Sequence, residues 1–153
     1  MTTQLISDEA VAVLLQSDEA SDPKSAGELV QRLLKEAGLP PWEDMEIELF
    51  PGVDGTLLMA RRANLVCEGY AFHDFEILVS ATGACPKNWP SQLWSYNGAY
   101  YLLLRRPVGE ESPDMNEFCL CDSLTSGMIA HILEHGKALI LSRAVELLQK
   151  NFA

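Results

Sequence analysis

Alternating side chains on both sides of Asn97-Gly98 predict a β-hairpin. Asn-Gly favours a type I′ turn, because both central residues of that turn need a positive φ. The expected strands run over 92–96 and 99–105, and the turn sets their register, with Trp94 opposite Tyr101. This register sorts the side chains into two apolar faces. One face carries Leu93, Tyr100, Leu102 and Leu104, and the other carries Trp94, Tyr96, Tyr101 and Leu103.

Before this hairpin, the pattern predicts two helices and a second hairpin. Ser7 and Ser25 are the expected N-caps of helices over 10–15 and 25–37. Glu28 follows Ser25 at the spacing of a capping box, which strengthens the second of these predictions. The strands of the second hairpin are expected over 46–50 and 56–62, where polar and apolar residues alternate.

After residue 64 the pattern starts again with a strand. Asp114 and Ser142 are the expected N-caps of two later helices, and a polar loop is expected over 105–113. The remaining elements are strands over 65–72 and 138–141 and helices over 73–82, 114–124 and 128–135, with a last helix after Ser142.

This element order predicts an α+β protein. We expect two small, tightly coupled modules, 1–63 and 64–153, each a hairpin-containing antiparallel sheet covered by helices. No linker rich in proline, glycine or serine separates them. The chain of 153 residues is long enough for one ordinary core or two small ones.

Composition narrows the class of protein. The hydrophobic fraction of 48% and charged fraction of 22% are typical of a globular protein, and no apolar segment has the length of a membrane span. The first residues have neither the basic nor the apolar region of a secretory signal, so we expect a cytoplasmic protein with reduced cysteines.

Charge is distributed unevenly along the chain. The net charge is −11, and the first 50 residues hold eleven acidic groups against three basic ones. Such a surface repels phosphate, so we expect no nucleic-acid partner and no binding to an anionic membrane. The acidic half could attract a basic partner, or it could simply be a solvated surface.

One arrangement has the character of a metal site. His131 and His135 are spaced to share one helical face, and Cys119 and Cys121 could complete a tetrahedral zinc site. On a helix, however, Cys119 and Cys121 would point about 200° apart. The favoured interpretation is therefore that Cys119 is buried, that the histidines flank a helix end, and that the protein needs no cofactor.

Catalytic patterns are weak. Three adjacent acidic pairs, 8–9, 43–44 and 110–111, fall in expected loops, where nothing makes their carboxylates converge. Cys85 has only Lys87 as a basic neighbour, and a nucleophile needs an activating base. We therefore expect a protein that is not an enzyme.

The aromatic hairpin face is the expected place for a partner. Tyrosine and tryptophan combine apolar area with a polar group and are enriched at binding hot spots. The candidate partner-binding residues are Trp94, Tyr96, Tyr101, Arg105 and Arg106. The alternative is that the N-terminal module or a symmetric second copy packs over this face.

Five phrases, taken in order, resemble one protein family. They are residues 45–55 (MEIELFPGVDG), 70–75 (YAFHDF), 93–102 (LWSYNGAYYL), 134–140 (EHGKALI) and 144–148 (AVELL). In this order they resemble the MecA-type adaptor proteins. The resemblance spans about 6–152 and is strongest after residue 65, which looks like the C-terminal domain of that family.

The resemblance implies adaptor function. In that family the C-terminal domain engages a ClpC-type AAA+ unfoldase and promotes its assembly, and the N-terminal domain recruits a client, such as a competence regulator, for degradation. The chain departs from the family by having few residues before Ser7, which predicts a smaller first sheet, and almost no acidic linker. The short linker favours an alternative, a regulatory interaction module of this fold that does not bind the unfoldase.

Overall fold

The computed structural model describes residues 4–16, 23–119 and 123–153, and it confirms the α+β class. In these residues, two four-stranded antiparallel sheets and four helices form two compact units. The units are Met1–Asn64 and Leu65–Ala153, divided one residue after the expected boundary. Each unit buries its own apolar core. No described helix combines the length and the apolar character needed to cross a membrane.

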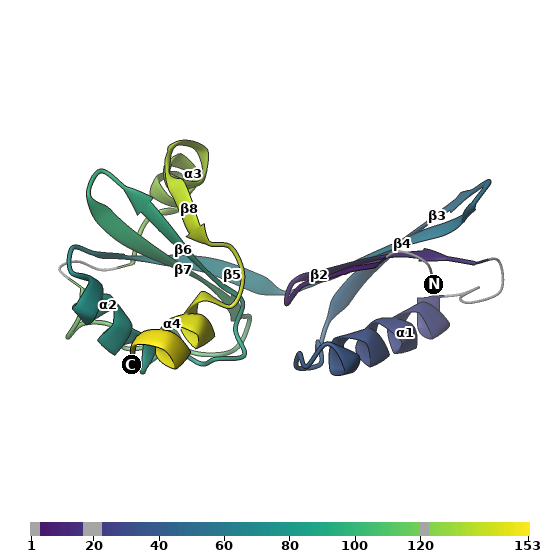
Figure 1. Ribbon diagram of the computed structural model, residues 1–153, viewed down its shortest axis with the longest axis horizontal. Helices are drawn as coiled ribbons and strands as arrows, with labels where there is room; N and C mark the ends of the chain where they lie inside the picture. Colours follow the sequence, from purple (N-terminus) through teal and green to yellow (C-terminus); the bar gives the residue numbers. More distant parts are fainter. Residues whose placement is uncertain (1–3, 17–22, 120–122) are drawn as a thin grey trace. The chain divides into compact units, whose positions relative to one another are not determined.

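The first unit is a sheet with a helix on one face (Figure 1). Its elements are β1 (Gln4–Ile6), β2 (Ala10–Leu15), α1 (Pro23–Glu36), β3 (Met45–Gly52) and β4 (Gly55–Arg62), and the strand order is β1-β2-β4-β3. The apolar residues of α1 recur at helical spacing and therefore form one stripe. This stripe packs on the inward-facing side chains of the sheet. The buried members are Val11, Val13, Leu15, Ala26, Leu29, Val30, Leu33, Leu34, Trp42, Leu58 and Ala60.

The helix expected over 10–15 is wrong, because this segment is strand β2. Every second residue of β2 is buried, as in a strand with one face against a core. Ser7 holds the preceding turn: its Oγ accepts the N–H of Ala10 at 3.0 Å and donates to the carbonyl oxygen of Ala10 at 3.2 Å. Serine makes such bonds in turns as well as at N-caps, so the sequence signal was ambiguous.

The expectation of a smaller first sheet is also wrong. Strand β1 precedes Ser7 and pairs antiparallel with β2, with Leu5 opposite Ala12. Three residues are enough for this edge strand, so the first sheet has four strands despite the short segment before Ser7.

The second unit is a sheet covered on both faces. Its elements are β5 (Leu65–Phe72), α2 (Phe75–Thr82), β6 (Ser91–Tyr96), β7 (Ala99–Pro107), α3 (Ser126–His135), β8 (Lys137–Ile140) and α4 (Ala144–Phe152). The strand order is β5-β7-β6-β8. Helices α2 and α4 lie on one face and α3 on the other (Figure 1). Strand β7 runs to Pro107, so the polar loop begins three residues later than expected.

The central hairpin has the predicted register. Trp94 lies opposite Tyr101, and Tyr96 lies opposite Ala99. The turn residues Asn97 and Gly98 have φ values of 48° and 77°, as the Asn-Gly pair predicted. The two faces are also as predicted: Leu93, Leu102 and Leu104 belong to the core under α2 and α4, and Tyr101 belongs to the cluster under α3.

The helix expected over 114–124 is wrong in its described part. A single turn follows Asp114, in which the amides of Phe118 and Cys119 bond to the carbonyl of Met115. Met115 is buried in the core under α2 and α4, whereas Leu124 belongs to the cluster under α3. These two residues therefore pack on opposite faces of the sheet.

The expected cap at Ser142 is wrong as well. Helix α4 begins after Arg143, which has a φ of 56° and makes no side-chain cap. The amide of Val145 instead donates to Oγ of Ser91, at 2.9 Å, from strand β6. Ser91 is 54 residues away in sequence, so local capping rules could not reveal it.

Candidate interaction surfaces

Helix α3 covers the aromatic face of the central hairpin. Tyr101 is 8% exposed and packs in one cluster with Ala99 and Ile132, the last of which is fully buried. Trp94 and Tyr96 lie at the edge of this cluster and are partly buried. Helix α3 of the same unit therefore covers the aromatic face. From the sequence, the alternative to a partner was a cover by the N-terminal module or by a second copy.

Gly69 on β5 makes the close approach of α3 possible. A Cβ at this position would lie 2.9 Å from Leu124, 3.0 Å from Leu103 and 3.2 Å from Ile129. These contacts are too short for a Cβ unless the neighbouring side chains shift, so glycine lets the segment that leads into α3 pack closely here. The amide of Leu124 also donates to the carbonyl of Gly69, at 2.8 Å.

The exposed rim of this face is polar. The hydroxyl of Tyr96 lies 2.9 Å from Nε2 of His131, and the ring of His131 lies 4.6 Å from that of His135, centroid to centroid. His131 and His135 share one face of α3, as their spacing predicted.

The structure does not assemble the candidate zinc site from its described members. Cys119 packs against the core under α2 and α4, on the opposite side of the sheet from the two histidines of α3. Among the residues that the structure describes, no three histidine, cysteine, aspartate or glutamate side chains are placed to hold a metal ion. Cys121 lies outside the described residues.

Arg106 is engaged inside its own unit. Its Nε donates to Oε1 of Glu68 at 2.6 Å, and its Nη1 donates to the carbonyl of Glu110 at 2.6 Å. The side chains of Arg106 and Glu68 are only 20% and 12% exposed. This ion pair spans strands β5 and β7, so the charge of Arg106 is already satisfied without a partner. Arg105 is half-buried, and its amide donates to the carbonyl of Pro90.

Three donors converge on the carboxylate of Glu68. Burial opposes ionisation, but hydrogen bonds from Ser112, Arg106 and Tyr70 outweigh this effect and hold the pKa of Glu68 below its usual value. Ser112 Oγ donates at 2.6 Å and the Tyr70 hydroxyl at 2.9 Å. Glu68 therefore ties the loop after β7 to strand β5, which is a structural task.

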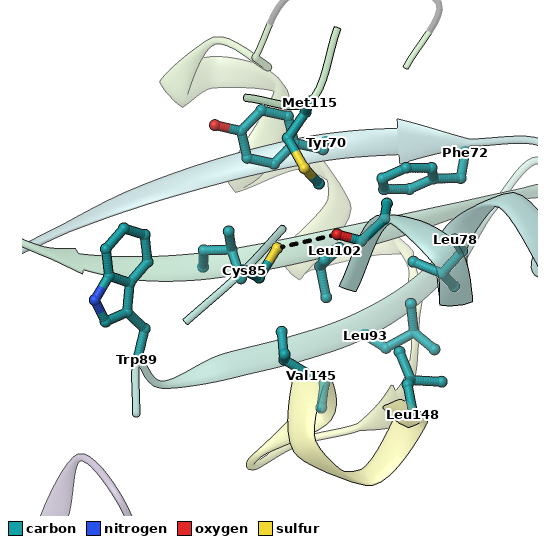
Figure 2. Close-up of a cluster of buried hydrophobic side chains, with 13 residues drawn as sticks. Tyr70, Phe72, Leu78, Cys85, Trp89, Leu93, Leu102, Met115, Val145 and Leu148 are labelled. Atoms are coloured by element: carbon teal, nitrogen blue, oxygen red, sulfur yellow. Dashed lines mark hydrogen bonds between the residues drawn. The ribbon is translucent and has the colours of Figure 1, made fainter. Parts of the chain in front are cut away.

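The core beneath α2 and α4 contains Cys85 (Figure 2). Cys85 is 5% exposed, and its Sγ lies 3.6 Å from the carbonyl of Ala81. Burial, with a smaller contribution from Cys119, raises the pKa of Cys85 to about 12. A thiol this weakly acidic is not an activated nucleophile.

An apolar groove of about 600 Å³ lies between helices α2 and α4. Phe75 and Phe152 meet edge to face in it, with ring centroids 5.0 Å apart, and Phe152 is 61% exposed. The rest of the groove is lined by Glu76, Val79, Ser80, Thr82, Gly83, Gln149 and Ala153. Helix-bounded apolar grooves of this kind are typical places for a partner to dock.

The sheet of the first unit has a face that none of its described helices covers (Figure 1). The large apolar side chains on this face are exposed: Leu5 by 72%, Phe50 by 47%, Leu57 by 38% and Met59 by 37%. Phe50, Leu57 and Met59 line a second groove of about 530 Å³, together with Ala10, Glu46, Glu48 and Arg61. Contiguous exposed apolar area of this kind marks interaction surfaces.

Sequence reasoning did not find these two grooves. The signal for the sheet face is present, because residues 57–60 of β4 are apolar on both sides of the strand although α1 covers only one. The groove between α2 and α4 joins residues more than 60 positions apart and has no local signal.

Comparison of the chain with family models, with curated proteins and with solved structures finds no match.

Proposed function

We propose that the chain is a non-enzymatic adaptor that links a client protein to a ClpC-type AAA+ unfoldase. One observation carries this proposal: each of the two compact units has a separate core, and each has a groove with exposed apolar side chains on its own surface. Two units with one binding surface each are what a linking protein needs.

The assignment of partners to units follows the resemblance to MecA-type adaptors. The first unit recruits the client through its open sheet face, and the second binds the unfoldase through the groove between α2 and α4. Such a protein works in the cytoplasm, where these unfoldases act.

The shifted titratable groups are explained by the packing of the second unit. Among the described residues, the side chains with clearly shifted pKa values include those of Glu68, Tyr70 and Cys85. All three belong to the packed interior of the second unit or to its hydrogen-bond network. Their pKa shifts have structural causes, namely burial and internal hydrogen bonds. Shifts of this origin do not require a reaction.

Titration of the full chain with the N-terminal domain of a ClpC-type unfoldase tests the proposal. We expect saturable binding, weakened by Phe152→Glu, which places a charge in the groove between α2 and α4. Leu133→Glu is the matched control, because Leu133 is an exposed apolar residue of α3, outside that groove. Absence of association at tens of micromolar, roughly the affinity of weak specific complexes, would count against the proposal.

A regulatory interaction module without unfoldase binding is the second candidate. The junction at Asn64 favours it, because no separate linker segment lies between Arg62, the end of β4, and Leu65, the start of β5. Failure of the unfoldase titration, together with co-migration of another defined protein, would select this candidate.

A further inference from the structure

Strand β3 is a long edge strand that, in the part of the first unit that the structure describes, has a neighbouring strand on one side only. The strand order β1-β2-β4-β3 places β1 and β3 at the edges of the first sheet (Figure 1). β1 has three residues, whereas β3 has eight and pairs, among the described residues, with β4 only. Its outer row of backbone N–H and C=O groups can therefore pair with one more strand.

The other long edge, β5 in the second sheet, is different. The amide of Leu124 donates to the carbonyl of Gly69 on its outer side, and Leu124 packs there. A segment of the chain thus lies along β5, while β8 at the opposite edge has four residues. β3 is the edge best suited to add a strand.

Charge decides which strand fits. Residues 43–54, which contain β3 and its flanks, hold five acidic groups and no basic one. Glu46, Glu48 and Phe50 point to the uncovered face in alternation and are exposed. The nearby cation Arg61 contacts Glu48 at 3.8 Å, with both side chains more than half exposed, so it neutralises little of this charge.

An identical β3 strand is a poor partner for this edge. In an antiparallel pair of two β3 strands, glutamates would come to lie near glutamates, and like charges placed opposite each other destabilise a sheet. A strand with lysine or arginine at alternate positions would place opposite charges across the pair. Its apolar side chains would reach Phe50 and the groove beside Leu57 and Met59.

We infer that β3 is the docking edge for an extended client segment in which basic and apolar residues alternate, and that this segment adds as a fifth strand. The inference rests on the proposed function, because it assigns a chemistry to the client that the first unit recruits. Main-chain pairing provides the affinity, and Glu46, Glu48 and Phe50 select the sequence.

A fluorescent octapeptide of alternating valine and lysine is the probe, titrated against the full chain by anisotropy. We expect saturable binding, chemical-shift changes concentrated in Met45–Gly52, and no binding of the same peptide with glutamate in place of lysine. The double variant E46K/E48K should weaken binding by about tenfold or more.

The matched control is E28K/E36K. It makes the same charge change on two exposed glutamates of α1, one of which also contacts an arginine, Arg32, at 3.9 Å. This control should bind the peptide within about twofold of the wild type, because its charges lie outside the edge. Thermal melting of both variants verifies that the first unit stays folded.

Backbone pairing is tested separately with a peptide N-methylated at alternate residues, which keeps its charges but loses its outward N–H groups. We expect this peptide not to bind when the methyl groups face β3. Equal binding of the methylated peptide, an equal effect of the two double variants, or dimerisation of the wild-type chain through β3 would overturn the inference. The variant E46K/E48K should bind the unfoldase as the wild type does. If the wild-type chain does not bind the unfoldase, that result counts against the adaptor proposal and not against peptide docking at β3.

Discussion

Arg106 and Glu68 join strands β7 and β5 through a charge-assisted hydrogen bond of 2.6 Å that is largely buried. The pair also anchors the loop after β7, because Ser112 donates to the same carboxylate oxygen and Trp89 Nε1 donates to Oε2 of Glu110. Arg106, which the sequence suggested as a partner contact, therefore makes these hydrogen bonds inside the second unit.

Replacing Arg106 with leucine should destabilise the second unit by about 3 kcal/mol, because it leaves the carboxylate of Glu68 buried without its charged partner. Urea unfolding followed by resonances of β5 and β7 measures this change. Arg61→Leu is the control: its ion pair with Glu48 is exposed, and the variant should change stability by less than about 1 kcal/mol. Equal effects of the two variants would contradict the buried role of Arg106.

Acid should weaken the second unit through Glu68. The pKa of Glu68 in the folded state is lower than 4.5, the ordinary value of the free side chain. At pH values between these two pKa values, the unfolded chain therefore binds more protons than the folded chain. The contribution of Glu68 is therefore complete above about pH 4.5 and is lost as the pH falls through the folded pKa. Unfolding curves across this pH range should show that the free energy of unfolding falls with acid in the wild type. In Glu68→Gln this free energy should depend less steeply on pH. If Glu68→Gln leaves the pH dependence of stability unchanged, another titratable group causes the loss of stability in acid.

Two glycine-to-alanine substitutions should have opposite signs. Gly69→Ala forces contacts of 2.9–3.2 Å with Leu124, Leu103 and Ile129 and should cost about 1–3 kcal/mol. Gly127→Ala lies in the first turn of α3 with nothing within 4 Å, and it should stabilise the helix by up to about 1 kcal/mol. Thermal or urea unfolding compares them, and a destabilising Gly127→Ala together with a neutral Gly69→Ala would refute the described packing of α3.

Cys85 should resist alkylation in the folded protein. With a pKa of about 12, its thiolate is a fraction on the order of 10⁻⁴ at pH 8, and the side chain is 5% exposed. Mass spectrometry after brief iodoacetamide treatment should find Cys85 unmodified without denaturant and modified in urea. Modification in the native protein at the rate seen in urea would show that the core under α2 and α4 opens readily.

The central hairpin was predictable because its information is local. Asn97 and Gly98 specify a turn with positive φ, the turn specifies the register, and the alternation of apolar residues specifies both faces. The same local reasoning failed at Ser7, because a serine hydroxyl binds backbone groups in turns as well as at helix starts.

The features that the sequence did not reveal are contacts between distant parts of the chain. Ser91 caps α4 from another strand, and Met115 and Leu124 pack on opposite faces of the sheet. The candidate surface at Tyr101 is covered by α3, a packing that no local pattern specified. For the same reason, the groove between α2 and α4 emerged only from the fold, whereas the open sheet face left a signal in β4.

The adaptor proposal is tested most directly by the ATPase rate of a ClpC-type unfoldase measured against increasing concentrations of the full chain, with sedimentation of the same mixtures. We expect the ATPase rate to rise saturably as the unfoldase assembles with the chain, and Phe152→Glu to shift the curve to higher concentrations. A flat ATPase rate, with the chain and the unfoldase sedimenting separately throughout, would contradict the proposed link to the unfoldase.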